Sequence, residues 1–202
     1  ERELIRSGIE TFCNEISNSI DVKWEIAGEE NIPAEGTFMV YANHQSFADI
    51  YAILKLFSTH RQMGFVAKDE WRKVKIIADG IEYTRSVFLK RGDAREALQT
   101  IKETTDLLNK GYALTIFPEG TRSQSSEMGE FKAGALKFAQ KAKVPILPVT
   151  LDGGYRLYEE KKSYQPCTIR ITVHPLVHIE TMSKHEAGEA YRQIEETVKS
   201  AL

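Results

Sequence analysis

Apolar residues recur every three or four positions at the start of the chain and then in short alternating runs. The helical spacing predicts an amphipathic helix over residues 2–18, and the alternation of Val22, Trp24 and Ile26 with polar residues predicts a strand. Further strands are predicted over residues 37–41, 63–67, 86–90, 112–117, 144–151 and 168–174. Further helices are predicted over residues 47–57, 69–78, 93–109 and 131–142, and after the capping pair Ser183 and Glu186.

This alternation of strands and helices predicts an α/β fold, with a mostly parallel central sheet flanked by helices. No internal repeat and no linker-like stretch interrupts the pattern, so residues 1–202 are expected to form a single domain. In such sheets, ligands bind beyond the carboxyl ends of the strands. The loops after Tyr41, Lys90 and Phe117 are therefore the first places to look for a functional site.

Charge and cysteine usage narrow the classes of function. With 27 Lys and Arg against 29 Asp and Glu, the net charge is −2, so no bulk positive field exists to hold nucleic acid or an anionic lipid surface. Any anion site must be local. Cys13 and Cys167 lie outside any CxxC motif, which argues against a disulfide framework and a cysteine zinc site and favours a reducing cytosolic setting. No apolar run approaches the roughly 18 residues of a membrane-spanning helix.

The first candidate site is the segment Asn43–Asp49, which directly follows a predicted strand. His44 and Asp49 are five positions apart, so in one continuous helix their side chains would diverge by about 140°. They can meet if His44 lies in the loop and Asp49 in the first helical turn, which Ser46 as N-cap would produce. In the alternative interpretation, Ser46 and Asp49 form only a capping box and His44 is an ordinary polar loop residue.

The second candidate is residues 117–123, Phe-Pro-Glu-Gly-Thr-Arg-Ser, which again follow a predicted strand. Pro-Glu-Gly favours a turn, and Gly120 permits close approach of the backbone to a ligand. Arg122 offers a planar guanidinium suited to a phosphate, with a hydroxyl residue on either side. The alternative is an ordinary turn that carries a solvated arginine.

Two more segments have both a functional and a structural interpretation. Lys90 and Arg91 stand at the end of the strand predicted over 86–90. They form either an anion site or a strand end whose cations are solvated. The predicted strand at 144–151 contains Pro145 near its start and Pro148 further along. Its structural interpretation is a core strand that has one proline at its first residue and the other at a sheet edge. No nucleotide-binding loop motif and no serine nucleophile elbow is found in the sequence.

Taken together and in this order, the segments resemble the motifs of the glycerolipid acyltransferases. They are most similar to those of the 1-acyl-sn-glycerol-3-phosphate (lysophosphatidate) acyltransferase family. The matching blocks are Asn43–Asp49, Val87–Arg91, Phe117–Ser123 and Val144–Pro148, and they span about half of the chain. A histidine, four residues and an aspartate form a weak motif alone, but followed by Phe-Pro-Glu-Gly-Thr-Arg-Ser they are specific. One small difference is Phe47, where the family often has tryptophan.

This resemblance implies transfer of a fatty acyl group from acyl-CoA or acyl-carrier protein to the sn-2 hydroxyl of 1-acyl-sn-glycerol 3-phosphate, giving phosphatidic acid. His44 would be the general base and Asp49 would orient it, with no covalent acyl-enzyme, no metal ion and no cofactor. Glu119 is expected to orient one of the cations that hold the acceptor. Binding of the acceptor is assigned to Lys90, Arg91, Glu119, Gly120, Thr121 and Arg122, and structural or acyl-pocket roles to Asn43, Pro118, Pro145 and Pro148.

Other functions use the same motifs. The acceptor could be glycerol 3-phosphate, another lysophospholipid or an aminoacyl lipid, because the residues of these motifs recognise only a hydroxyl group and an anionic group. A thioesterase, or an inactive module that binds lipid or acyl-carrier protein, is a further alternative, and intact His44 and Asp49 argue against the inactive module. No nucleic-acid partner is expected.

Because the acceptor and the product are both lipids, the site is expected to face a membrane from its cytoplasmic side. Attachment would be peripheral, or through membrane-binding residues upstream of Glu1. The helix at 2–18 and the basic segment 61–91 are the candidate contacts within the chain. The favoured alternative for the helix is that its apolar stripe packs on the core, and the alternative for the basic segment is a solvated face.

Overall fold

The structure, a computed structural model, describes residues 2–89 and 94–202. Within these residues, seven strands form one sheet in the order β1-β7-β6-β2-β5-β3-β4. All neighbouring strands are parallel except β6 and β7, so the predicted mostly parallel α/β sheet is confirmed. The strands are β1 (Val22–Ala27), β2 (Met39–Ala42), β3 (Met63–Lys68), β4 (Val87–Leu89), β5 (Ala113–Ile116), β6 (Ile146–Asp152) and β7 (Cys167–Val173).

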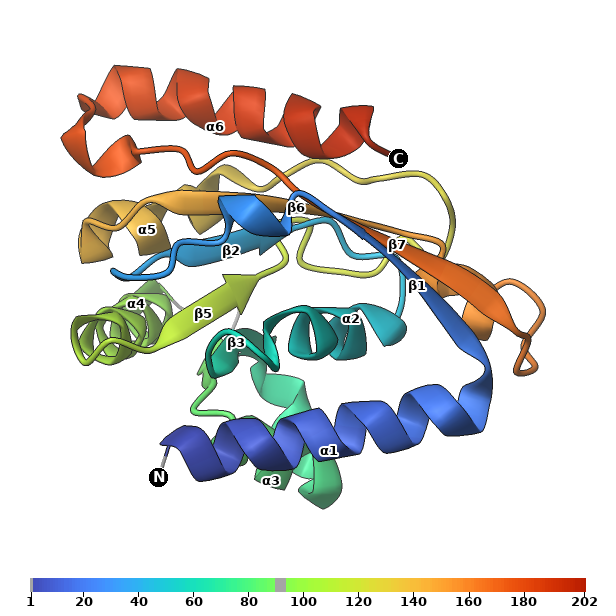
Figure 1. The fold of residues 1–202 in the computed structure, drawn as a ribbon. Coiled ribbons are helices and arrows are strands. Elements are labelled where there is room, and N and C mark those ends of the chain that lie inside the picture. Colours follow the sequence, from blue (N-terminus) through green and yellow to red (C-terminus); the bar gives the residue numbers. More distant parts are fainter. Residues whose placement is uncertain (1, 90–93) are drawn as a thin grey trace.

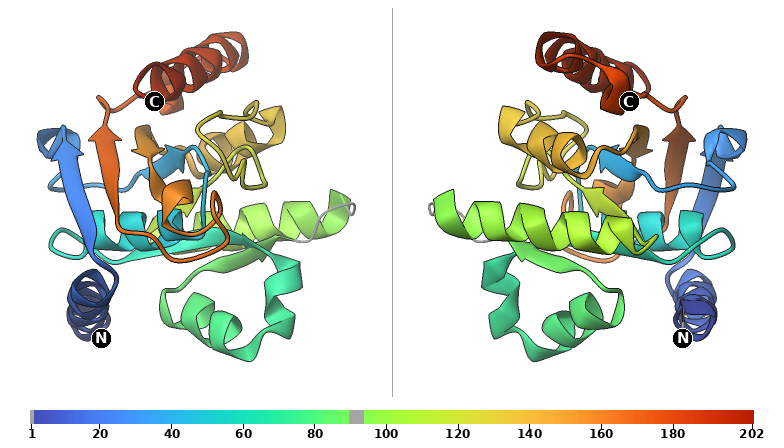
Figure 2. Two further views of the ribbon diagram at one scale, coloured as in Figure 1. Left: turned by 90° about the vertical axis from the view of Figure 1, so that its right-hand side faces the viewer. Right: turned by 90° about the vertical axis from the view of Figure 1, so that its left-hand side faces the viewer.

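Helices cover both faces of the sheet. Figure 1 shows α6 and α5 on one side of it and α2 on the other, with α1 outermost, and the turned views in Figure 2 place α6 and α1 at opposite ends of the molecule. The helices are α1 (Arg2–Ile20), α2 (Ala48–Phe57), α3 (Lys75–Tyr83), α4 (Ala94–Asn109), α5 (Leu136–Ala142) and α6 (Lys184–Ser200). The predicted Ser183–Glu186 capping box is present at the start of α6, because each residue's side chain accepts from the other's backbone N–H.

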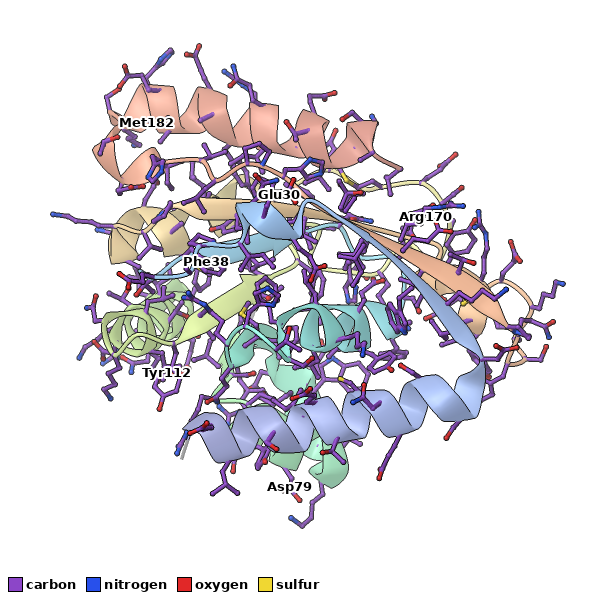
Figure 3. All side chains as sticks on the ribbon, in the orientation of Figure 1. Glu30, Phe38, Asp79, Tyr112, Arg170 and Met182 are labelled. Atoms are coloured by element: carbon purple, nitrogen blue, oxygen red, sulfur yellow. The ribbon has the colours of Figure 1, made fainter. Side chains whose placement is uncertain are left out.

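Buried side chains form one apolar layer on each face of the sheet, because successive strand residues point to opposite faces. On β6, Ile146 packs beneath α4, α5 and α6, whereas Leu147 and Leu151 pack on the side of α2. Phe38, labelled in Figure 3, is fully buried in the layer on the α2 side. The central strands are thus buried on both faces, and their carboxyl ends are held in fixed positions.

Part of the apolar stripe of α1 packs on the core, as the alternative interpretation expected, whereas Leu4 is 78% exposed. Ile9 and Cys13 are buried against Tyr51 of α2, with Trp24 of β1 and Leu54 alongside. Across the described ranges 2–89 and 94–202, no helix combines the length and the apolar character that crossing a bilayer requires.

Two predicted helices are broken in the structure. Residues 69–78 form a 3₁₀ turn (Asp69–Lys73), and α3 starts only at Lys75, because Val74 adopts an extended conformation between them. Residues 131–142 are helical only from a 3₁₀ turn at Ala133–Ala135 onwards. Phe131 and Lys132 precede the helix because Lys132 has an extended backbone (φ −68°, ψ 125°), and their N–H groups donate to Glu195 and to the Pro118 carbonyl.

The predicted position of Pro148 at a sheet edge is wrong, since β6 lies between β7 and β2. The pairing of β6 with β7 ends at Val149–Val173, and an isolated bridge follows at Ile146–Val177. Two β6 residues therefore face three residues of the following segment, as in a bulge. A proline, which lacks a backbone N–H, is tolerated in a central strand at such a place.

The buried face of β6 gives a test of this packing. Leu147→Ala should lower the free energy of unfolding by about 2–5 kcal/mol, because it removes side-chain contacts and leaves a cavity between β6 and α2. The same change at Leu98 of α4, which is 62% exposed, should alter stability by no more than about 0.5 kcal/mol. Urea denaturation of both variants measures the difference, and equal losses would contradict the assignment of Leu147 to the core.

Candidate active site

The loops that follow β2 and β5 meet at the carboxyl ends of these two strands, where a functional site was predicted. Because β2 and β5 are parallel neighbours, their carboxyl ends lie side by side. The Ser123 N–H donates to the His44 carbonyl at 2.8 Å, and the Gln124 N–H donates to the Gln45 carbonyl at 3.0 Å. The His44 ring stacks on Phe117 with 4.0 Å between ring centroids. The first and second predicted segments therefore form one site.

His44 and Asp49 are in direct contact. The imidazole Nδ1 lies 2.8 Å from Asp49 Oδ2, and Asp49 is 1% exposed whereas the histidine side chain is 15% exposed. The same carboxylate oxygen accepts the backbone N–H groups of Gln45 and Ser46 at 2.6 and 2.7 Å. Within the described part of the chain, no group hydrogen-bonds His44 Nε2. The carboxylate thus fixes one ring nitrogen and leaves the other available to a substrate.

Burial and hydrogen bonding act on the Asp49 carboxyl in opposite directions. Burial raises its pKa above the ordinary value, and the donors from His44, Ser46 and Gln45 lower it. An ionised carboxylate is acceptor-only, which matches an oxygen that receives two backbone N–H groups and the imidazole. This geometry favours the Nδ1–H tautomer of His44, with a basic Nε2.

Ser46 caps the first turn of α2 as predicted. The helix is assigned from Ala48, but Phe47 already has helical backbone angles (φ −63°, ψ −28°), and the Ser46 hydroxyl accepts from the Ala48 N–H at 3.0 Å. The Ser46 hydroxyl accepts from the Ala48 N–H rather than from the Asp49 N–H, so the capping-box alternative is only half present. Ser46 instead donates its hydroxyl to Glu159 at 2.8 Å. Asp49 both supports the turn and holds His44.

Two side chains fasten this turn to β6 and the loop after it. The Asn43 amide donates to the Leu151 carbonyl and accepts the Leu151 N–H, both at 2.8 Å. The side-chain amide oxygen of Gln45, Oε1, accepts from the Gly153 N–H at 3.0 Å. Asn43 is completely buried, so its contacts are those expected of a structural residue.

Gly154, in the same loop, leaves space beside the dyad. A Cβ atom at Gly154 would lie 2.9 Å from Asp49 Oδ1, closer than side-chain carbons come. That oxygen is buried and has no hydrogen-bond partner in the described residues. Absence of a side chain at this position therefore allows the carboxylate to keep its place.

Glu119 holds two backbone N–H groups of the site. It is 4% exposed and accepts the His44 N–H at 2.5 Å on one oxygen and the Gly129 N–H at 2.8 Å on the other. Burial raises the pKa of Glu119 to about 7, although both N–H groups favour the carboxylate. Of the cations that Glu119 was expected to orient, Arg122 makes its ion pair with Glu159 instead, and Lys90 and Arg91 lie outside the described residues.

The other residues of this loop follow the predicted turn. Gly120 has a φ of 67°, which glycine adopts without strain. Pro118 is buried and its carbonyl accepts from the Lys132 N–H at 3.1 Å, whereas Thr121 is exposed. The predicted anion-site residues Lys90 and Arg91, and the first residue of the helix predicted over 93–109, lie outside the described residues. Pro145 immediately precedes β6, and its carbonyl accepts from the Met39 N–H at 3.0 Å.

Arg122 is oriented by Glu159, a residue that sequence reasoning missed. Its guanidinium Nη1 donates to Glu159 Oε1 at 3.1 Å, and its guanidinium carbon lies 3.5 Å from the centroid of the Phe47 ring. Arg122 remains 24% exposed, so part of the guanidinium faces solvent. Glu159 lies in the loop after β6, and the strand-end rule applied to the predicted strand at 144–151 would have pointed to this loop.

Comparison with known proteins agrees with this architecture. A family model described as Acyltransferase matches residues 23–152. A chloroplastic 1-acyl-sn-glycerol-3-phosphate acyltransferase from Brassica napus is 39% identical over 132 residues, which are 65% of this chain and 38% of the plant protein. A probable enzyme of the same name from Mycoplasma pneumoniae is 31% identical over 87% of this chain and 71% of its own length. The chain spans less than half the length of its plant and algal relatives.

A solved structure is also similar over nearly the whole chain. The crystal structure of the 1-acyl-sn-glycerophosphate acyltransferase from Thermotoga maritima has a TM-score of 0.81 and 30% identity, and the match covers 97% of this chain and 78% of that one. The matched family segment contains the His44–Asp49 pair and Arg122. From the family match and the shared fold together, the chain belongs to the acyltransferase family.

Proposed function

We propose that this chain transfers a fatty acyl group from a thioester donor to the sn-2 hydroxyl of 1-acyl-sn-glycerol 3-phosphate, giving phosphatidic acid. The observation that carries the proposal is the His44–Asp49 contact beside the partly exposed Arg122 guanidinium. The names of the Brassica, Mycoplasma and Thermotoga relatives support the choice of acceptor. The donor, acyl-CoA or acyl-carrier protein, is a co-substrate, and the proposed chemistry uses no further cofactor.

The histidine supplies the base that the reaction requires. An alcohol attacks a thioester slowly unless its proton is removed as the new bond forms. In the proposal, His44 Nε2 accepts the proton of the sn-2 hydroxyl while the oxygen bonds to the acyl carbon. The Asp49 carboxylate stabilises the resulting imidazolium through Nδ1–H. The tetrahedral intermediate then expels the thiolate, and the proton passes from the imidazolium to that sulfur.

The acceptor's phosphate determines where its hydroxyl lies. A guanidinium binds phosphate with a planar pair of donors, and among the described residues Glu159 alone accepts a hydrogen bond from Arg122, through Nη1. In the proposal, the exposed part of Arg122 holds the phosphate, and Lys90 and Arg91, which follow β4 in the sequence, contribute further positive charge. Fixing the phosphate places the sn-2 hydroxyl at His44 and removes the entropy cost of finding that position during the reaction.

The acyl group is proposed to pass directly from donor to acceptor. Burial raises the pKa of the Cys13 thiol to about 11 and also raises the pKa of Cys167. Neither cysteine lies in the loops of the site, and a thiol with a raised pKa is a poor nucleophile. The Ser46 hydroxyl, which lies between His44 and Asp49 in the sequence, donates to Glu159 rather than to His44.

The reaction is proposed to take place at a membrane surface, on the cytoplasmic side, with the chain attached peripherally. The support is chemical, since acceptor and product are lipids. Parts of the basic segment 61–91 are already neutralised, because Arg72 pairs with Asp69 and Lys75 with Asp79. The exposed apolar residues Phe47 and Ile50, at the start of α2, offer an apolar contact beside the site.

The role of His44 is tested by His44→Ala. Lysophosphatidate-dependent thiol release from acyl-CoA should fall by about 10²–10⁴-fold, because the base is lost. His185→Ala, on the exposed face of α6, is the matched control and should retain full activity. Normal turnover by a folded His44→Ala variant would refute the mechanism, and thiol release without any acceptor would indicate a thioesterase.

The phosphate site is tested by Arg122→Ala and Arg122→Lys. The KM for lysophosphatidate should rise about tenfold or more in the alanine variant, with the lysine variant in between, because a lysine lacks the planar fork. The KM for acyl-CoA should change little. Arg192→Ala on the surface of α6 serves as control. A change confined to the KM for acyl-CoA would assign Arg122 to the donor's phosphates instead.

A further inference from the structure

Glu159 is a buried carboxylate that joins segments of the site far apart in the sequence. Its side chain is 4% exposed. Oε2 accepts the Ser46 hydroxyl at 2.8 Å, and Oε1 accepts the Phe47 N–H and Arg122 Nη1, each at 3.1 Å. Removing a carboxylate from water is costly, and such a group is rarely kept unless it is paired and hydrogen-bonded.

The contacts of Glu159 determine the direction of Arg122. The carboxylate holds one edge of the guanidinium, and the Phe47 ring covers one of its faces. No other hydrogen bond to Arg122 is found in the described residues, so the remaining donors are available. Because the guanidinium is planar, contacts on one edge and one face fix the direction in which the free donors point.

Glu159 also connects Arg122 with the base. Ser46 donates its hydroxyl to Glu159 and its backbone N–H to Asp49, so a single residue touches both carboxylates. Asp49 in turn holds His44. An unbroken chain of hydrogen bonds thus runs from Arg122 through Glu159, Ser46 and Asp49 to the imidazole.

We infer that Glu159 is a positioning residue that sets Arg122 relative to His44, and through it the acceptor's phosphate relative to the base. This inference rests on the proposed function. Charge alone predicts the opposite outcome, because a carboxylate beside the guanidinium weakens its attraction for an anion. If charge dominated, loss of Glu159 would improve binding of lysophosphatidate; if position dominates, loss of Glu159 weakens it.

Glu159→Gln separates these outcomes, since glutamine keeps the shape but presents one acceptor oxygen in place of two. We expect the KM for lysophosphatidate to rise roughly tenfold or more, the size of effect seen when one charge-assisted hydrogen bond is lost, with the KM for acyl-CoA unchanged. Glu160→Gln, at the exposed neighbouring residue, is the matched control and should behave as wild type. Thermal unfolding of each variant verifies that it is folded.

A double variant shows whether Glu159 acts through Arg122. In the Arg122→Ala background, Glu159→Gln should add little further loss, because the two residues are in contact and their effects are not additive. Fully additive losses would contradict the inference. If Glu159→Gln does not fold, Ser46→Ala, which removes the donor to Glu159 together with the acceptor of the Ala48 N–H, should still raise the KM for lysophosphatidate, and an unchanged KM would also contradict it.

The inference and the proposed function can fail separately. A wild-type protein without lysophosphatidate-dependent transfer would refute both. An active wild type with an unchanged or lower KM in Glu159→Gln would refute only the positioning role. A decrease in kcat with no change in the KM for lysophosphatidate would show that Glu159 acts on the turn that holds His44. That result would also overturn the inference that Glu159 positions Arg122.

Discussion

The site depends on one buried carboxylate oxygen, Asp49 Oδ2. It lies at the start of α2, and it receives the His44 ring and two consecutive backbone N–H groups. Burying a carboxylate costs several kcal/mol, and only converging donors recover that cost. Residues 44–46 must therefore fold tightly around Asp49. This turn places the imidazole at the carboxyl end of β2. The contacts of Asn43 with β6 and of Glu119 with the His44 N–H support the same turn.

The two buried acids beside His44 serve different groups of the same residue. Asp49 holds the ring, whereas Glu119 holds the backbone N–H and joins it to Gly129. Because burial raises the pKa of Glu119 from 4.5 to about 7, folding favours its protonated form. Its contribution to stability therefore falls as the pH rises from about 4.5 to about 7. Above that range Glu119 is ionised, and both of its oxygens can accept the N–H groups that they face.

The sequence predicts the sheet and the meeting of the two loops because both follow from local patterns. Alternating strands and helices imply parallel strands, and parallel strands bring His44 and Arg122 to the same edge. Contacts between distant segments are not encoded in such patterns. Glu159 reaches Arg122 and Ser46 across 37 and 113 positions, and nothing around it in the sequence distinguishes it from the exposed Glu160. Likewise, the Phe131 N–H donates to Glu195 across 64 positions, a contact that no local pattern predicts.

The most direct test of the central claim is the kcat of Asp49→Asn, measured on a variant shown to be folded. Asparagine has the same shape but no charge, so it cannot stabilise the imidazolium or enforce the Nδ1–H tautomer. We predict that kcat falls by about 10²–10⁴-fold while the KM for lysophosphatidate changes little. A normal kcat accompanied by a loss of stability would contradict the account, and would show that Asp49 only supports the start of α2.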